Sequence, residues 1–249
     1  MIASERFVEV AGRRLWTRTI GAGPSVLLGS GAGRAGVGQA PVIEAMLAQF
    51  ATVISYDRAG TGRSDPPPVP PRAGDMADDL AAVLDALDIA MPVLLTGFSL
   101  SALPCQLFAC RRPADVSGLL LLDPTPDDMV AAIADWPAEI QEVSRRNLIS
   151  GPNVAPAMAL EMEGLIDSAI EVREAIRARG LPDIPYRILA IERPGGAGLR
   201  EHHEAMAARA RQGRLVIVPG DGMDGHAGFF HDQGEMIVRM VREMLAREP

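Results

Sequence analysis

Runs of mostly apolar residues alternate with amphipathic stretches along most of the chain. Each run is four or five residues long, and the runs cover residues 25–28, 52–56, 93–96, 119–122, 187–191 and 215–218. Between the runs, apolar residues recur every three or four positions, as from Met76 to Leu87 and from Met236 to Leu245. Such runs are typical of strands buried on both faces, and the amphipathic stretches are typical of helices that cover a sheet. The alternation predicts an α/β fold, with a mostly parallel central sheet and helices on both faces.

Two regions depart from this alternation. Residues 7–20 alternate apolar and polar side chains around an Ala-Gly break, which predicts a β-hairpin at the antiparallel edge of the sheet. Residues 125–183 have no strand pattern and carry scattered Met, Leu and Ile at helical spacing. We interpret this second region as a small helical cap, inserted after the sixth strand of a single domain that spans residues 1–249.

Composition narrows the possible functions. All 24 basic residues are arginine, which excludes Schiff-base, phosphate-loop and kinase mechanisms because each needs a lysine. The net charge of −8 argues against nucleic acid as the main partner. The spacing of Cys and His does not resemble a zinc site, and Cys105 and Cys110 are expected to be small buried hydrophobes. We therefore predict an enzyme or binding protein for a small molecule, with no metal or organic cofactor.

Targeting signals are not evident in the sequence. It contains no apolar run of the roughly 18 residues that a membrane-spanning helix needs. Its first residues lack the basic-then-apolar pattern of a signal peptide. We expect a cytoplasmic protein without membrane contact; its oligomeric state stays open.

The segment Gly97-Phe98-Ser99-Leu100-Ser101 lies between an apolar run and an amphipathic stretch. A nucleophile elbow needs this strand–turn–helix context, with small residues two positions before and after the nucleophile. Ser99 is therefore the candidate nucleophile, although Ser101 departs from the usual glycine. The alternative is an ordinary strand-to-helix turn in which Ser99 only caps the helix.

Acyl transfer also needs hydrogen-bond donors for the oxyanion that develops on the substrate. One predicted donor is the backbone amide of Leu100, because it begins a helix. The second is the amide of Ala32, in the glycine-rich loop Gly29–Gly33 that follows an earlier strand. A phosphate-binding loop is the alternative interpretation of these glycines, and the absence of lysine disfavours it.

Together with this elbow, two further motifs resemble the α/β-hydrolase superfamily, in particular its small bacterial members with a helical cap. Residues 56–64 read Tyr-Asp-Arg-Ala-Gly-Thr-Gly-Arg-Ser and precede a proline-rich loop, and residues 121–125 read Leu-Leu-Asp-Pro-Thr. The resemblance extends over nearly the whole chain. It implies the α/β-hydrolase fold, and it implies that Asp57 and Arg58 hold the loop beside the active site rather than act in catalysis.

The resemblance also implies where the base and the acid lie. The family's catalytic histidine follows a glycine in the loop after the last strand, which indicates His226 after Gly225. The spacing is one residue longer than expected, so His231 is a second candidate. His202 and His203 are expected to be solvated on a surface helix.

The acid has two candidates. The family usually carries it after the seventh strand, where Glu192 is the nearest carboxylate, beside Arg193. Some members carry it at the end of the sixth strand, which indicates Asp123. We favour Asp123, and Glu192 stays the alternative acid.

The substrate is less well defined. Phe98, Ser30 and Trp136 are expected to line the pocket, with a largely apolar cap above it. We expect a serine hydrolase that cleaves a carboxylic ester, lactone or thioester of a mostly apolar small molecule through an acyl-serine intermediate. The alternatives are a cyclase, isomerase or lyase on the same fold, and a binding protein that does not turn its ligand over.

Overall fold

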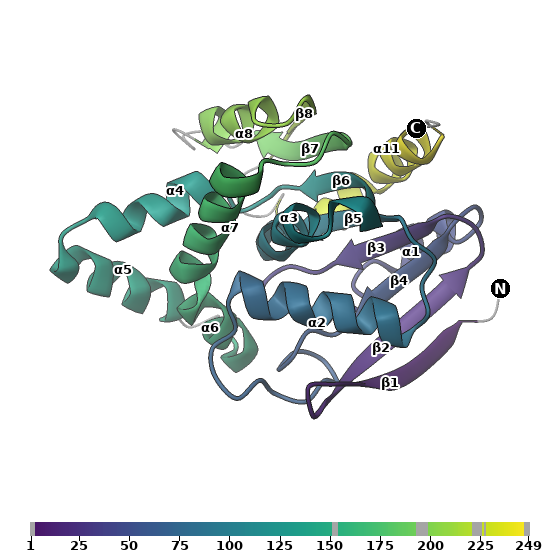
Figure 1. Ribbon diagram of the computed structural model, residues 1–249, viewed down its shortest axis with the longest axis horizontal. Helices are drawn as coiled ribbons and strands as arrows, with labels where there is room; N and C mark the ends of the chain where they lie inside the picture. The colour runs from purple at the N-terminus through teal and green to yellow at the C-terminus, as the bar shows by residue number, and fades with distance from the viewer. Residues whose placement is uncertain (1–2, 151–153, 193–198, 221–225, 227, 247–249) are drawn as a thin grey trace.

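The computed structural model describes residues 3–150, 154–192, 199–220, 226 and 228–246. Within them, one eight-stranded sheet has the strand order β1-β2-β4-β3-β5-β6-β7-β8 (Figure 1). The strands are β1 (Ser4–Val10), β2 (Arg13–Gly21), β3 (Ser25–Gly29), β4 (Thr52–Tyr56), β5 (Val93–Phe98), β6 (Val116–Leu122), β7 (Pro185–Glu192) and β8 (Gln212–Pro219). β2 pairs antiparallel with both β1 and β4, and the other strand pairs are parallel. The predicted sheet and its edge hairpin are confirmed.

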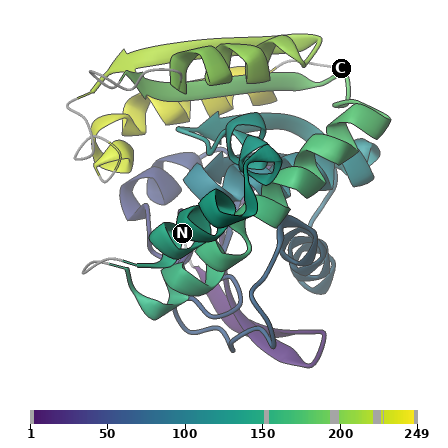
Figure 2. The ribbon, with the colours of Figure 1, turned by 90° about the vertical axis from the view of Figure 1, so that its left-hand side faces the viewer.

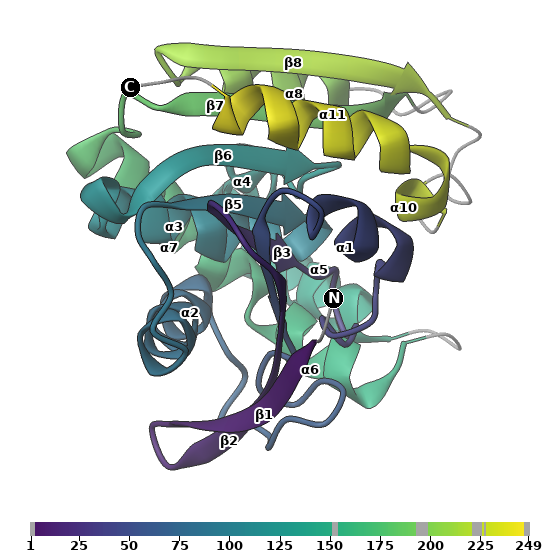
Figure 3. The ribbon, with the colours of Figure 1, turned by 90° about the vertical axis from the view of Figure 1, so that its right-hand side faces the viewer.

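Helices cover both faces of the sheet. One face carries α2 (Ala73–Ala86), α3 (Ala102–Arg111), α7 (Leu165–Arg179) and α8 (Leu199–Ala208), and the other carries α1 (Pro41–Leu47) and α11 (Gly234–Leu245) (Figures 1 and 3). Leu94 and Leu95 are both fully buried, yet they belong to the cores on opposite faces. This explains the continuous apolar runs, since successive side chains of a strand point to opposite faces and here both faces are covered.

The edge hairpin has a two-residue turn. Ala11 and Gly12 have φ angles of 47° and 74°, and Val10 pairs with Arg13 on either side of them. Two successive positive φ angles match the twist of the flanking strands, which is why such turns favour glycine. The Ala-Gly break in the sequence therefore lies where the chain reverses.

A helical segment separates β6 from β7. It contains α4 (Asp127–Ala131), a 3-10 turn at Ala132–Asp135, α5 (Ala138–Ile149), α6 (Pro156–Glu163) and α7. In Figure 1, α4 to α6 extend beyond the carboxyl ends of the parallel strands, and in Figure 2 they lie in front of the sheet. α7 packs on the body of the fold, because Ile166, Ala169 and Val172 are buried in the same core as α2 and α3, and α4 adds Val130 and Ala131 to that core. α5 has no buried residue and α6 has only Glu161, so these two helices are the projecting part of the segment.

Helix α1 carries a buried carboxylate, Glu44. This side chain is 2% exposed, and its nearest counter-charge is Arg18 Nε at 3.3 Å. Burial raises the pKa of Glu44, and Arg18 offsets this only in part. The folded state therefore binds the proton more readily than the unfolded state. It follows that Glu44 lowers the free energy of unfolding as the pH rises from its unfolded pKa through its higher folded pKa.

We expect Glu44→Gln to raise the thermal unfolding midpoint at pH 7, because it removes a buried charge. The difference from the parent protein should shrink as the pH falls to about 4, where the carboxyl of Glu44 is itself protonated. Thermal unfolding followed by circular dichroism at several pH values measures this, with the exposed Glu139→Gln as control. An unchanged or lower midpoint at pH 7 would contradict the expectation.

Candidate active site

The predicted nucleophile lies on a sharp turn between β5 and α3. Ser99 has a φ angle of 53°, a left-handed conformation that non-glycine residues rarely adopt and that often marks functional sites. It is partly exposed, whereas its neighbours Phe98 and Leu100 are buried. Gly97 makes the turn possible, because a Cβ atom there would lie 2.9 Å from the backbone of Ala102. The local geometry is the one the sequence motif predicts.

Ser101 occupies the position where the usual motif has glycine. Gly29 on the neighbouring strand provides the space, since a Cβ atom on Gly29 would lie 2.9 Å from the Ser101 Cβ. The Ser101 hydroxyl donates a hydrogen bond to the Ser30 carbonyl and accepts one from Arg58 Nη1 at 2.9 Å. Through its hydroxyl group, Ser101 therefore connects the elbow to the loop after β3, which a glycine could not do.

Asp123 follows β6 directly beside the elbow. Phe98 pairs with Leu122 across the two strands, so the chain positions that follow, Ser99 and Asp123, lie at the same edge of the sheet. Asp123 has a φ angle of 42° and a side chain that is 1% exposed. One carboxylate oxygen accepts a hydrogen bond from His226 Nδ1, and the other accepts the Ile191 amide at 3.3 Å. The carboxylate thus holds a defined imidazole tautomer, with its proton on Nδ1.

The His226 ring is also held from the side. It stacks on Phe98, with ring centroids 4.8 Å apart and an angle of 25° between the planes. Phe98 is the residue that precedes Ser99, so the imidazole lies next to the elbow. Phe98 was expected to line the pocket, and the structure places it 6% exposed against this histidine.

The competing acid and base lie elsewhere. Glu192 has a side chain that is 55% exposed and pairs with Arg200 at 2.7 Å. His231 is exposed on the short helix α10 (Phe229–Asp232). Of the four candidates, the structure therefore brings only Asp123 and His226 together. Arg193 and Gly225, which entered the sequence argument, lie outside the described residues.

The expectation that His203 is solvated is wrong. His203 is 2% exposed, because it lies on the face of α8 that packs against the sheet. Its Nε2 lies 3.0 Å from the carbonyl oxygen of Pro124, the residue after Asp123. His203 therefore helps to hold the turn that carries Asp123. Its neighbour His202 is partly exposed.

The glycine-rich loop after β3 runs next to the elbow. Gly29 pairs with Gly97 across β3 and β5. A Cβ atom on Gly31 would lie 3.0 Å from the Phe98 ring and 3.9 Å from the Ser99 Cβ. Among the described residues, none accepts a hydrogen bond from the Ala32 amide. The backbone of this loop thus passes within reach of a group bound at Ser99, as the predicted role of Ala32 requires.

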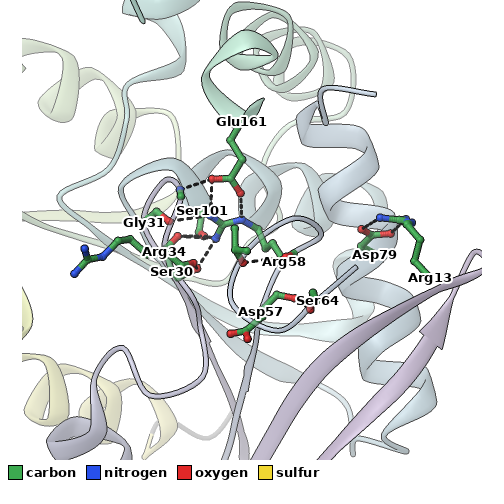
Figure 4. A network of polar contacts seen from close by, with 12 residues as sticks. Arg13, Ser30, Gly31, Arg34, Asp57, Arg58, Ser64, Asp79, Ser101 and Glu161 are labelled. Atoms are coloured by element: carbon green, nitrogen blue, oxygen red, sulfur yellow. Dashed lines mark hydrogen bonds and ion pairs between the residues drawn. The ribbon is translucent and has the colours of Figure 1, made fainter. Parts of the chain in front are cut away.

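A buried guanidinium connects this loop to the rest of the site (Figure 4). Arg58 Nη1 donates to the Ser30 carbonyl at 2.8 Å, and Nη2 donates to the Gly31 carbonyl at 2.8 Å. Burial disfavours the charged form, but Glu161 more than compensates, so the pKa of Arg58 lies above its ordinary value. The carboxylate of Asp57 accepts backbone amides of two nearby loop residues. The expectation that Asp57 and Arg58 hold the loop is confirmed.

Sequence reasoning missed Glu161. This residue is 1% exposed and pairs with Arg58 at 2.7 Å, although it lies in the largely apolar helix α6. A buried arginine requires a carboxylate nearby, because an unpaired buried charge is costly. The signal in the sequence was a single acidic residue between Leu160 and Met162, and nothing there indicated its partner.

Ser30 and Trp136 were also expected to line the pocket, and one of them is buried whereas the other is exposed. Ser30 is 2% exposed, and its hydroxyl belongs to the network around Arg58 rather than to an open wall. Trp136 is 46% exposed. Cys105 and Cys110 are buried, as expected, and burial raises the pKa of Cys105 to about 12 and that of Cys110 to about 11.

The described part of the chain has no group of three or more His, Cys, Asp or Glu side chains that could hold a metal ion. None of its helices is long and apolar enough to cross a membrane.

Named relatives and solved structures are similar to this chain. It is 39% identical over 106 residues to a protein of Variovorax paradoxus (strain S110) named "Putative carbamate hydrolase RutD", and the match covers 41% of this chain and 38% of RutD. A thermophilic esterase from Thermogutta terrifontis superimposes with a TM-score of 0.70 at 21% identity, over 97% of this chain and 98% of that chain. A haloalkane dehalogenase variant from Bradyrhizobium elkanii superimposes with a TM-score of 0.72 at 18% identity, over 98% of each chain.

The individual matches and the family model support different conclusions. The matches to curated relatives span well under half of those proteins' length, and the two solved structures share the fold at low identity. The family model described as the alpha/beta hydrolase fold matches residues 24–153, which is more than half of the chain. Together with the sheet order, this match shows that the chain belongs to the α/β-hydrolase family.

Proposed function

We propose that this protein is a serine hydrolase that cleaves a carboxylic ester, lactone or thioester through an acyl-serine intermediate. The observation that carries the proposal is the hydrogen bond between Asp123 and His226, beside a serine held at positive φ. A nucleophilic serine needs a neighbouring base, and the base needs a third group that orients it. Ser99, His226 and Asp123 provide these three roles on adjacent elements.

Each proposed step uses groups at this site. The Oγ of Ser99 attacks the carbonyl carbon while His226 takes its proton, and the oxyanion that forms is bound by the amides of Ala32 and Leu100. The tetrahedral intermediate then collapses, and the protonated imidazole gives its proton to the leaving alcohol or thiol. Water, deprotonated by the same imidazole, releases the acid from the acyl-serine.

Apolar side chains on the segment after β6 support a mostly apolar substrate. Five of the large hydrophobic side chains that are exposed in the described residues lie there: Met129, Trp136, Ile140, Val143 and Ile149. α4 to α6 extend beyond the strand ends that carry the candidate catalytic residues, and we propose that they act as the cap. Adaptable apolar surface of this kind suits acyl chains better than charged ones.

Three other functions are the alternatives to this proposal. Carbamates present a similar carbonyl group, and the relative RutD carries that substrate class in its name. A cyclase, isomerase or lyase, or a binding protein without turnover, would keep the fold without hydrolysis.

Assays with p-nitrophenyl esters of two to twelve carbons, a p-nitrophenyl carbamate and a fluorophosphonate probe separate these functions. We expect probe labelling at Ser99 and ester turnover that increases with acyl length before it declines. Labelling with turnover of the carbamate alone would change the substrate class. Absence of both labelling and turnover would contradict a serine hydrolase and favour the non-hydrolytic alternatives.

A further inference from the structure

A fully buried ion pair joins the helical segment to the loop beside the candidate active site. Arg58, which follows β4, and Glu161, at the carboxyl end of α6, have side chains that are 5% and 1% exposed. The two groups make a two-pronged contact, with Nε to one carboxylate oxygen at 2.7 Å and Nη2 to the other at 3.0 Å. Such forked pairs fix orientation as well as distance.

The same pair holds the backbone of the loop after β3 at several points (Figure 4). Arg58 donates to the carbonyl oxygens of Ser30 and Gly31, each at 2.8 Å. Glu161 accepts the backbone amide of Gly33 at 2.6 Å. The peptide groups on both sides of Ala32 are therefore held by one buried pair.

These contacts determine where the Ala32 amide points. The Gly31 carbonyl and the Ala32 N–H belong to the same peptide group, and in a planar trans peptide they point in opposite directions. Because Arg58 binds the Gly31 oxygen, the Ala32 N–H must point away from Arg58. The donor expected to bind the oxyanion is thus oriented by a residue that does not itself touch substrate.

Close packing adds a second link between α6 and the loop. Gly33 has a φ angle of 64°, and a Cβ atom there would lie 2.5 Å from the Cβ of Met158 and 2.8 Å from its Cα. The backbone of the loop therefore lies directly against α6, one turn before Glu161. A displacement of α6 would remove the counter-charge of Arg58 and this contact together.

We propose that Arg58 and Glu161 are a positioning pair that orients the Ala32 amide for oxyanion binding, so that the site is complete only when α6 is seated. This inference rests on the proposed serine hydrolase function. A purely structural role for the pair predicts lower stability without a change in catalysis. A positioning role predicts a loss confined to the transition state, because the oriented amide binds charge that develops only there.

The test uses two variants that treat the pair differently. Arg58→Met/Glu161→Met replaces the buried pair with apolar side chains of similar length, a change that buried ion pairs often tolerate without loss of stability. Arg58→Lys keeps the charge beside Glu161 but lacks the planar fork that reaches two carbonyl groups at once. Glu163→Gln, an exposed change on the same helix, is the control.

Kinetics are measured with the best p-nitrophenyl ester, at a temperature where circular dichroism shows each variant folded. We expect the double variant to lose roughly 10²-fold in kcat, as when one oxyanion donor is removed, with a smaller loss for Arg58→Lys. KM should change by less than about threefold, because ground-state binding is kept. Affinity for a trifluoromethyl ketone with the same acyl chain should fall in parallel with kcat, because its adduct carries the oxyanion.

The outcomes separate this inference from the proposed function. If the parent protein is active and a folded variant keeps kcat and ketone affinity near the parent values, the positioning role is overturned while the hydrolase function stands. Should the double variant fail to fold, Arg58→Lys decides in the same way. A parent protein that is neither labelled by a fluorophosphonate nor active on any ester overturns the proposed function, and the inference with it.

Discussion

Replacing Ser99 with alanine is expected to lower kcat on an ester substrate by roughly four to six orders of magnitude, since the loss of a nucleophile removes the acyl-enzyme route altogether. The residual rate should reflect only substrate binding and the oxyanion donors. The thermal unfolding midpoint should stay close to that of the parent protein, because the side chain removed is small and partly exposed. Progress curves of p-nitrophenyl ester hydrolysis measure kcat, and intact-protein mass spectrometry measures the loss of fluorophosphonate labelling.

The matched control is Ser4→Ala, which removes an exposed hydroxyl at the edge of the sheet. It should keep the parent kcat and the parent labelling. If Ser99→Ala kept turnover within tenfold of the parent protein, the acyl-serine mechanism would be wrong. Loss of activity together with a lowered unfolding midpoint would instead indicate that the elbow had collapsed, which thermal unfolding of both variants detects.

Asp123→Asn is expected to lower kcat by roughly 10⁴-fold, by analogy with the serine-protease triad. The carboxylate accepts a hydrogen bond from His226 Nδ1. An asparagine amide group turned toward the ring would donate there instead, which selects the wrong imidazole tautomer and removes the charge that stabilises the imidazolium. Steady-state kinetics with the same ester, at matched folding by circular dichroism, measure the effect.

Glu192→Gln is the natural comparison, because Glu192 is the competing acid. Its carboxylate is half-exposed and pairs with Arg200, so we expect kcat to stay within about twofold of the parent value. A large loss in Glu192→Gln and a small loss in Asp123→Asn would move the acid to the end of β7. Small losses in both variants would indicate a serine–histidine dyad, or a reaction other than serine hydrolysis.

Local patterns in the sequence determined most of the fold. The apolar runs became the parallel strands because each strand is buried on both faces, a property that depends on a few consecutive residues. The Ala-Gly break lies at the hairpin turn, and Gly97 lies in the elbow, two residues before Ser99. Both conformations tolerate few side chains. Features that depend only on neighbouring residues can therefore be predicted from the sequence.

The choice between Asp123 and Glu192 required the tertiary structure. Asp123 follows β6 and Glu192 ends β7 at the same edge of the sheet, so the sequence favoured Asp123 but left Glu192 as the alternative acid. The pairing of β5 with β6 sets Asp123 beside the elbow, and α8 supplies Arg200 as the partner of Glu192. Such a decision depends on contacts between elements that are far apart in the chain.

The buried network is the clearest case of what the sequence could not reveal. Arg58 belongs to a recognisable motif, but Glu161 lies 103 positions later in a segment without one. The cost of an unpaired buried charge requires that Arg58 have a counter-charge, yet it does not say which carboxylate supplies it. Only the packing of α6 against Gly33 brings that carboxylate into place. The sequence by itself thus determined the sheet, the elbow and the chemical groups at its edge, whereas the tertiary structure decided their partners, because pairing depends on distances that folding alone creates.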